Sequence, residues 1–225
     1  PHKINYRANI YALKKLGVTD IISVSAVGSL KNEHKPGSFV LVDQFIDRTV
    51  GRTNTFFDGS CVAHVSLANP ISTQLLNLIY KSKIKNIKIK KGGTYVAIEG
   101  PQFSTLAESM LYKSWKCDVI GMTNMPEARL AREGEMGYAS VSMITDYDCW
   151  HKGHDNVTVD QIISTMKQNT NSVKLLLNSI FENVNTLKKW NWEDKIYSCL
   201  DGAIITDRKN INAKDKRRLS LFLKQ

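Results

Sequence analysis

The stretch PEARLAREGEMGYASVSMITDYD (126–148) shows the pattern that decides the fold. Pro126 fits the first turn of a helix, and Gly137 marks the end of that helix. The residues that follow, 138–145, are small or apolar without polar alternation, which is typical of a strand buried on both faces. The stretch therefore predicts a helix that packs on a central sheet.

Helices and strands alternate on both sides of this stretch. The other predicted helices cover residues 5–17, 69–83, 105–115, a long segment from 158 onward and 209–218. The other predicted strands cover residues 20–26, 38–47, the TYVAI run inside 92–103, and 117–122. Such alternation favours a sheet covered by helices on both faces. The predicted fold class is α/β, with a central mixed, mostly parallel β-sheet flanked by helices.

Capping boxes support two of the predicted helices. The first pairs Thr105 with Glu108, and the second pairs Thr158 with Gln161. Behind the second box, apolar residues recur at helical spacing as far as Ile180. Both helices are therefore expected to start at these threonines.

Composition indicates a soluble globular protein. The chain has 225 residues, 42% of them hydrophobic, and we predict a single α/β domain over 1–225. The four cysteines are widely spaced without a CxxC pair, which favours a reducing, cytoplasmic setting. No run approaches the roughly 18 apolar residues that a membrane span needs.

The formal net charge of +10 raises the question of a nucleic-acid partner. Lysines concentrate in KSKIKNIKIKK (81–91) and KNINAKDKRR (209–218), without interleaved aromatic residues for base stacking. A solvated surface explains both runs, so no nucleic acid is expected. A nucleic-acid binder would lose affinity steeply as salt increases.

Two aspartates, Asp146 and Asp148, end the apolar run of the opening stretch. Residues two apart in a strand point to the same side, so both carboxylates are expected to reach one ligand. Close carboxylates raise each other's pKa, and a pair that shares a proton donates one hydrogen bond and accepts another. The alternative is structural: one aspartate caps a turn and the other is solvated.

Three other strand ends carry groups that suit a ligand, and ligands bind at the carboxyl ends of strands in such sheets. They are SAVGS (25–29), EGPQF (99–103) and GMTNMPE (121–127), with hydroxyls, an acid, a ring and a thioether. Each also has an ordinary explanation, as a turn or, for the methionine, as core.

Read in order, SAVGSL, DQFIDRT, FFDG, IEGPQFST, GMTNMPEARLARE and TDYDCW resemble the trimeric purine nucleoside phosphorylase family, in particular its branch that acts on 5'-methylthioadenosine. The resemblance runs from about Asn5 to at least Leu177. It implies phosphate-dependent cleavage to adenine and 5-methylthioribose 1-phosphate in purine and methionine salvage, by a homotrimer. It also implies inorganic phosphate as co-substrate, with no metal and no organic cofactor.

The resemblance also implies roles for individual residues. Ser25, Ala26 and Thr123 match phosphate contacts, and Thr123 also lies near the sugar. The substrate-contacting positions match Phe103, Met122, Val159, Ile162 and Ile163, the last three as an apolar wall near the 5' substituent. As part of an amphipathic helix, those three would otherwise be plain core. His151 and His154, in a loop, are not expected to bind a metal.

The implied substrate gives a chemical reason for the two aspartates. Adenine offers N7 as an acceptor and its 6-amino group as a donor. We assign a protonated Asp146 to N7, where it stabilises the charge that develops on the leaving base, and Asp148 to the amino group. An enzyme for 6-oxopurines is expected to have asparagine here, because O6 needs a donor.

The sequence also departs from the family. An N-terminal strand with a glycine-rich phosphate loop, and a later Arg-His pair, have no counterpart among the 225 residues. Gly121 stands where animal members have asparagine. The sequence is thus expected to be a fragment of an enzyme, or a truncated nucleoside-binding remnant without catalysis. A broader purine nucleoside phosphorylase that accepts adenosine or inosine is the other alternative.

Overall fold

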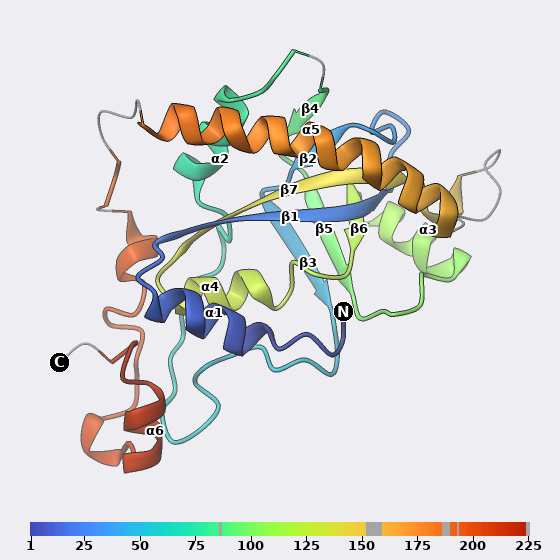
Figure 1. Ribbon diagram of the computed structural model, residues 1–225. Helices are drawn as coiled ribbons and strands as arrows, with labels where there is room; N and C mark the ends of the chain where they lie inside the picture. Colours follow the sequence, from blue (N-terminus) through green and yellow to red (C-terminus); the bar gives the residue numbers. More distant parts are fainter. Residues whose placement is uncertain (86, 152–158, 186–189, 193, 224–225) are drawn as a thin grey trace.

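The described residues, 1–85, 87–151, 159–185, 190–192 and 194–223 of the computed structural model, form a seven-stranded sheet in the order β3-β5-β6-β1-β7-β2-β4 (Figure 1). The strands are β1 Asp20–Ser29, β2 Phe39–Leu41, β3 Gln44–Arg48, β4 Ile89–Lys91, β5 Thr94–Ile98, β6 Val119–Gly121 and β7 Gly137–Asp146. Most neighbouring strands run parallel, and only the β1/β6 and β2/β7 pairs of this sheet are antiparallel. The predicted mixed, mostly parallel α/β class is confirmed.

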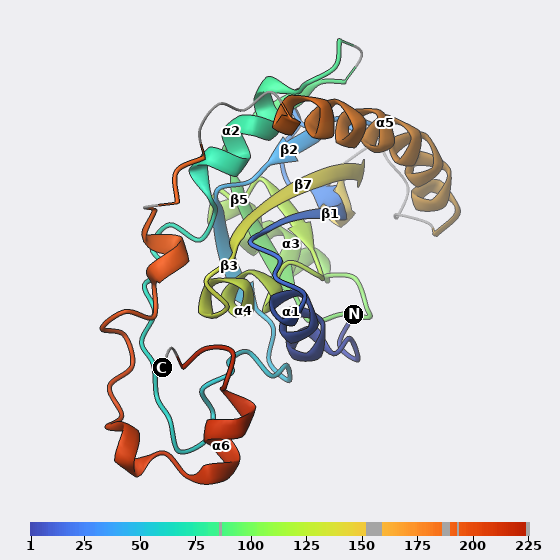
Figure 2. The same ribbon diagram turned by 60° about the vertical axis from the view of Figure 1, so that its left-hand side comes forward.

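Helices cover both faces of this sheet (Figures 1 and 2). One face carries α2 (Thr73–Lys81) and the long α5 (Val159–Asn185), and the other carries α1 (Tyr6–Lys15) and α4 (Glu127–Glu133). The other described helices are α3 (Leu106–Ser114), α6 (Ala213–Arg218) and the short 3-10 helices η1 (Asp148–Trp150), η2 (Lys195–Ser198) and η3 (Arg208–Asn210). Strand β7 is therefore almost completely buried, as its apolar sequence requires, whereas β1 is only partly buried and leaves Val24 exposed.

Local sequence explains most helix ends. Thr105 and Glu108 form the expected capping box at the start of α3, in which each side chain bonds to the other's backbone N–H. Asn5 and Ser72 cap α1 and α2 in a similar way. Thr158, from the second predicted box, lies outside the described residues. The helix predicted to end near 137 is shorter, because Gly134 already closes α4 and β7 begins at Gly137.

The strand predicted over 38–47 is wrong as a single element, because the structure divides it into β2 and β3. The break is at Asp43, whose carboxylate accepts the Gly93 N–H over 3.1 Å while its own N–H donates to the Gly93 carbonyl. Gly92 and Gly93 have φ angles of 83° and 146°, which only glycine adopts readily. The chain therefore turns both at Asp43 and at the paired glycines. As a result, the β2/β4 pair and the β3/β5 pair lie at opposite ends of the strand order.

The two lysine runs end up in different places. The first includes the end of α2 and β4, and the second includes η3 and α6, which lies at the other end of the molecule in Figure 1. The single helix predicted over 209–218 is thus two short helices. Arg218 of α6 binds Asp58 and Asp215, which fixes this end of the chain against residues 56–60. None of the described helices is long and apolar enough to cross a membrane.

Asp118, directly before β6, supports a prediction about stability. Burial alone would raise the pKa of this carboxyl, but hydrogen bonds from His34, the Thr94 N–H and Lys31 outweigh it and lower the pKa to about 2. A lowered pKa stabilises the fold above the unfolded-state pKa, and this contribution is lost as pH falls towards 2. We expect Asp118→Asn to reduce the free energy of unfolding by about 2 kcal/mol at pH 7.

Urea unfolding between pH 7 and pH 3 measures this effect. The difference between Asp118→Asn and the unaltered protein should shrink below about pH 4, where the aspartate loses its advantage. Glu33→Gln removes an exposed carboxylate from the same region and serves as the control. A constant difference at every pH would contradict the electrostatic origin.

Candidate active site

A cleft of about 450 Å³ opens where β1, β6 and β7 end. Seven residues predicted for the site line it: Ser25, Ala26, Phe103, Met122, Thr123, Asp146 and Asp148. They come from four separate stretches of the sequence. The fold therefore gathers the predicted strand ends around one space, as expected for an α/β sheet.

The predicted apolar wall is a different case. Ile163 lies in α5, is 45% exposed and is not among the residues that line the cleft. The side chains of Val159 and Ile162, like His154, lie outside the described residues. His151 stacks on the ring of Tyr147 at 4.5 Å. The 5' wall therefore stays a prediction from the sequence resemblance.

The two aspartates reach the cleft by a different route from the predicted one. Asp146 is the last residue of β7, whereas Asp148 opens η1 with a φ angle of 54°, in the left-handed region. The Asp148 N–H donates to Oδ1 of Asp146 over 2.7 Å, which holds the turn between them. The same-strand geometry was wrong, although both carboxylates still line one cleft, because the turn brings Asp148 back to it.

Each carboxylate has its own hydroxyl partner. Thr145 donates to Oδ2 of Asp146 over 2.6 Å, and Ser109 donates to Oδ2 of Asp148. Burial raises the pKa of Asp146, and burial also raises the pKa of Asp148, with a smaller contribution from the Asp146 charge. Removal from water is thus the main reason why this site favours a bound proton, and mutual repulsion is secondary.

Helix α3 holds the segment that carries Asp148. Ser109 is fully buried on this helix and binds the Asp148 carboxylate, while Cys149 donates to the Ser104 carbonyl. Lys113 lies over the ring of Trp150, and the indole N–H of Trp150 donates to the Ser29 carbonyl over 2.8 Å. These contacts fix η1 between α3 and the end of β1, so that Asp148 keeps its place in the cleft.

Hydroxyl groups also gather at the cleft, where Ser25 and Thr123 line it and Tyr95 contacts both. Ser25 Oγ lies 3.0 Å from Thr123 Oγ1 and 3.4 Å from the hydroxyl of Tyr95. Ser25 is nearly buried, while Thr123 is half-buried. Hydroxyl and backbone N–H donors of this kind suit the oxygens of an anion.

Arg52 supports the loop that carries Met122 and Thr123. Its guanidinium donates to the carbonyls of Met122 and Met125 over 2.7 and 2.6 Å, and to the Glu99 carbonyl over 2.6 Å. Its Nε also pairs with the Glu99 carboxylate at 3.1 Å, and the side chain is only 2% exposed. One cation therefore ties together the ends of β5 and β6 beneath the cleft.

The structure gives a reason for Gly121, which differs from the asparagine expected from animal members of the family. A Cβ atom at this position would lie 2.0 Å from the hydroxyl oxygen of Tyr95 and 2.6 Å from its Cζ. The buried Tyr95 ring thus occupies the space of a side chain at 121. Glycine is required here by close packing.

Comparison with known proteins identifies the family. Residues 1–182 match the family described as the phosphorylase superfamily, which is most of the chain. The chain belongs to the phosphorylase superfamily. The predicted resemblance is therefore confirmed, and the cleft lies within the matched residues.

Its relatives within this superfamily have one name. The chain is 48% identical to the S-methyl-5'-thioadenosine phosphorylase of Rhodospirillum rubrum, covering 98% of this chain and 75% of that protein. It is 58% identical to the one of Bradyrhizobium diazoefficiens, over 79% of this chain and 61% of that protein. The chain thus spans about three-fifths to three-quarters of these relatives.

Solved structures agree with these relatives. A methylthioadenosine phosphorylase from an Antarctic soil metagenomic library is 40% identical, with a TM-score of 0.90 over 100% of this chain and 78% of that one. Methylthioadenosine phosphorylase from Schistosoma mansoni, in complex with adenine, is 30% identical, with a TM-score of 0.83 over 90% of this chain and 78% of that one.

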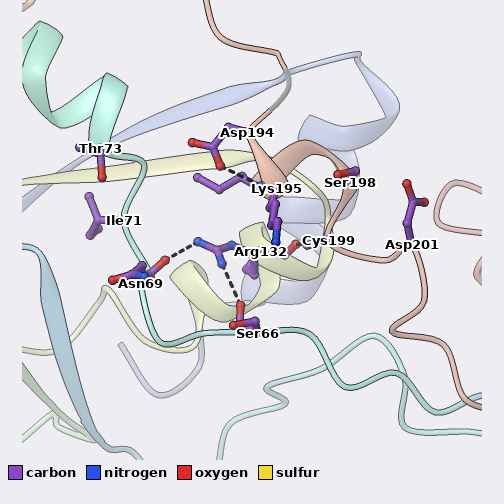
Figure 3. A pocket seen from close by; sticks show the side chains of 11 residues that line it. Ser66, Asn69, Ile71, Thr73, Arg132, Asp194, Lys195, Ser198, Cys199 and Asp201 are labelled. Carbon is purple, nitrogen blue, oxygen red and sulfur yellow. Dashed lines mark hydrogen bonds between the residues drawn. The ribbon is translucent and has the colours of Figure 1, made fainter.

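This phosphorylase chain has a second cavity, of about 560 Å³, beside α4 (Figure 3). Arg132 points into it, and its guanidinium donates to the carbonyls of Ser66 and Asn69 over 2.8 and 2.6 Å. Those bonds give the buried cation a structural role. Among the predicted active-site residues whose side chains the structure describes, none lines this cavity.

Sequence reasoning missed several residues of the phosphorylase site. Tyr95, Ser109 and Arg52 carry no local motif, because their contacts are made with residues distant in the sequence. Ser104 lines the cleft, and its buried hydroxyl oxygen has no hydrogen-bond partner among the described residues. Its place directly after Phe103 in the EGPQFST motif was the only available signal.

Proposed function

We propose that this protein cleaves 5'-methylthioadenosine with inorganic phosphate, giving adenine and 5-methylthioribose 1-phosphate. The observation that carries the proposal is the pair of partly buried carboxylates, Asp146 at the end of β7 and Asp148 in η1, which line one cleft. The relatives named S-methyl-5'-thioadenosine phosphorylase support the same reaction. The protein is thus proposed as a pentosyltransferase of purine and methionine salvage.

The carboxylates read the base in this proposal. Asp146, whose pKa burial raises, keeps a proton and donates it to N7 of adenine as the glycosidic bond breaks. Asp148 accepts from the 6-amino group. The hydrogen bond from Ser109 partly offsets the increase that burial causes in the pKa of Asp148, as the bonds from Thr145 and the Asp148 N–H do at Asp146. An ionised Asp148 offers lone pairs to that amino group.

The sugar and phosphate occupy the remaining sides of the cleft. Phe103 contacts base and sugar, and Met122 contacts the ribose. Ser25, the Ala26 N–H and Thr123 hold phosphate, one of whose oxygens forms the new bond to C1' of an oxocarbenium-like ribose. The electrons of the breaking glycosidic bond stay with the leaving base and are delocalised towards N7. Protein side chains, a backbone N–H and the co-substrate provide all of these groups, so we propose no metal and no organic cofactor.

We also propose a homotrimer in the cytoplasm. Helix α3 and the adjoining loop present large exposed apolar side chains beside the cleft: Phe103, Leu106, Met110, Leu111 and Trp115. Exposed apolar surface of this kind suits contact with another subunit. The four cysteines of the chain are free thiols, which fits a reducing compartment.

Release of adenine from methylthioadenosine, measured with and without phosphate, tests the proposal. We expect release that depends on phosphate, with adenosine cleaved less well and inosine hardly at all, because a 6-oxo group meets the acceptor Asp148. Equal cleavage of inosine would indicate a broader nucleoside phosphorylase. Binding without release would indicate a nucleoside-binding remnant and reject the proposed reaction.

A further inference from the structure

Tyr95 lies directly behind the hydroxyls proposed to bind phosphate. It belongs to β5 and has no exposed surface. Its hydroxyl oxygen accepts the Thr123 N–H over 3.4 Å and lies 3.4 Å from Ser25 Oγ. Tyr95 is not among the residues that line the cleft, so it acts on a ligand only through its neighbours.

The position of the Tyr95 hydroxyl is closely fixed. Its ring meets Phe45 edge to face, with 5.7 Å between the ring centroids. On the other side, the backbone of Gly121 approaches so closely that a Cβ atom there would overlap the hydroxyl. The oxygen is therefore held at one place, in reach of Ser25 and Thr123.

The protons available to Tyr95, Ser25 and Thr123 indicate which of these groups donates each hydrogen bond. Burial raises the pKa of Tyr95, so its hydroxyl keeps its proton at neutral pH. The Thr123 N–H can only donate, and the Tyr95 oxygen accepts it, whereas the phenol proton can be donated to Ser25 Oγ at 3.4 Å. Ser25 then donates to Thr123 Oγ1 over 3.0 Å. The Thr123 proton is left for the cleft.

If these hydrogen bonds run in the reverse direction, the cleft repels an anion. If Thr123 donates to Ser25, the Ser25 proton goes to the Ala26 carbonyl at 3.4 Å, and the cleft faces lone pairs. Phosphate oxygens are acceptors at neutral pH, so lone pairs repel them and hydroxyl protons attract them. The Tyr95 proton favours the order that suits phosphate.

We propose that Tyr95 is a positioning residue that orients the Ser25 and Thr123 hydroxyl protons towards bound phosphate. The inference rests on the proposed function, because it assigns the anion at these hydroxyls. It adds a buried residue outside the cleft to the determinants of phosphate affinity. It also predicts that loss of one distant oxygen atom changes phosphate binding selectively.

Tyr95→Phe removes only that oxygen, and steady-state kinetics with each substrate varied in turn tests its role. We expect the KM for phosphate to rise about five- to tenfold, the size of one hydrogen bond between neutral groups, with the KM for methylthioadenosine within twofold. The matched control is Tyr138→Phe, which removes an equally buried hydroxyl, bonded to Glu127 and away from the cleft. It should leave both KM values unchanged.

Thermal unfolding at increasing inorganic phosphate gives a second readout that needs no turnover. The phosphate concentration for half of the stabilisation should rise by the same factor in Tyr95→Phe. An unchanged phosphate KM and unchanged half-saturation in this variant would overturn the inference while the proposed function stands. If the unaltered protein neither turns over nor responds to phosphate, the phosphate site is wrong and both fall.

Discussion

Replacing Asp146 with alanine is expected to lower kcat/KM for methylthioadenosine by about 10³-fold, the typical contribution of a positioned proton donor. The side chain is held at the end of β7 by Thr145 and the Asp148 N–H, and burial raises its pKa. Without it, charge develops on N7 of the leaving base with no partner. Phosphorolysis of methylthioadenosine, followed by adenine release, measures the loss.

Two variants sharpen this prediction. Asp207→Ala removes an exposed carboxylate at the start of η3, far from the residues that line the cleft, and should leave the rate unchanged. Asp146→Asn keeps an N–H donor but has no proton to transfer, so it should recover only part of the loss. Full activity in Asp146→Ala would show that another group protonates the base.

The raised pKa of Asp146 also predicts a pH dependence. The proton required at N7 is present below that pKa and is lost as pH rises through it, so kcat/KM should fall on the alkaline side. Because an aspartate in water titrates near 3.9, an upward shift moves this fall towards neutral pH. The Asp146→Asn variant, which cannot lose such a proton, should lack the fall. An identical profile in both proteins would assign the titration to another group.

Arg52→Met is expected to have the largest effect on stability. The substitution removes donors from the buried carbonyls of Met122, Met125 and Glu99 and leaves the Glu99 carboxylate without its cation. Breaking a buried cation network costs about 3–5 kcal/mol. At about 2–4 °C per kcal/mol for a chain of this size, Tm should fall by roughly 10 °C. Activity should fall too, because the loop that carries Met122 is released.

Arg7→Met provides the comparison for Arg52. Arg7 pairs with Asp58 at 2.6 Å, but both side chains are about one-third to two-fifths exposed. Exposed pairs contribute less than about 1 kcal/mol, so Tm should change by a few degrees at most. Thermal unfolding followed by circular dichroism measures both variants. Equal shifts in the two would contradict the role of burial at Arg52.

Local sequence patterns predicted much of the fold because they record local physics. The apolar run 138–145 became β7, and Thr105 with Glu108 became the cap of α3, since burial and capping depend on neighbouring residues. The predicted strand over 38–47 failed for the same reason. Its break depends on Asp43 meeting Gly93, fifty residues away, which no local pattern contains.

For the candidate site too, some features could be predicted from local sequence and others depend on the tertiary structure. The sequence by itself determined which groups stand at or just after the strand ends, Asp146 and Asp148 above all, because the end of an apolar run is visible in its own residues. Only the tertiary structure decided that burial raises both pKa values and that the hydroxyls of Ser109 and Tyr95 lie next to Asp148 and Ser25. Burial and hydrogen-bond direction arise from segments that meet only when the chain has folded.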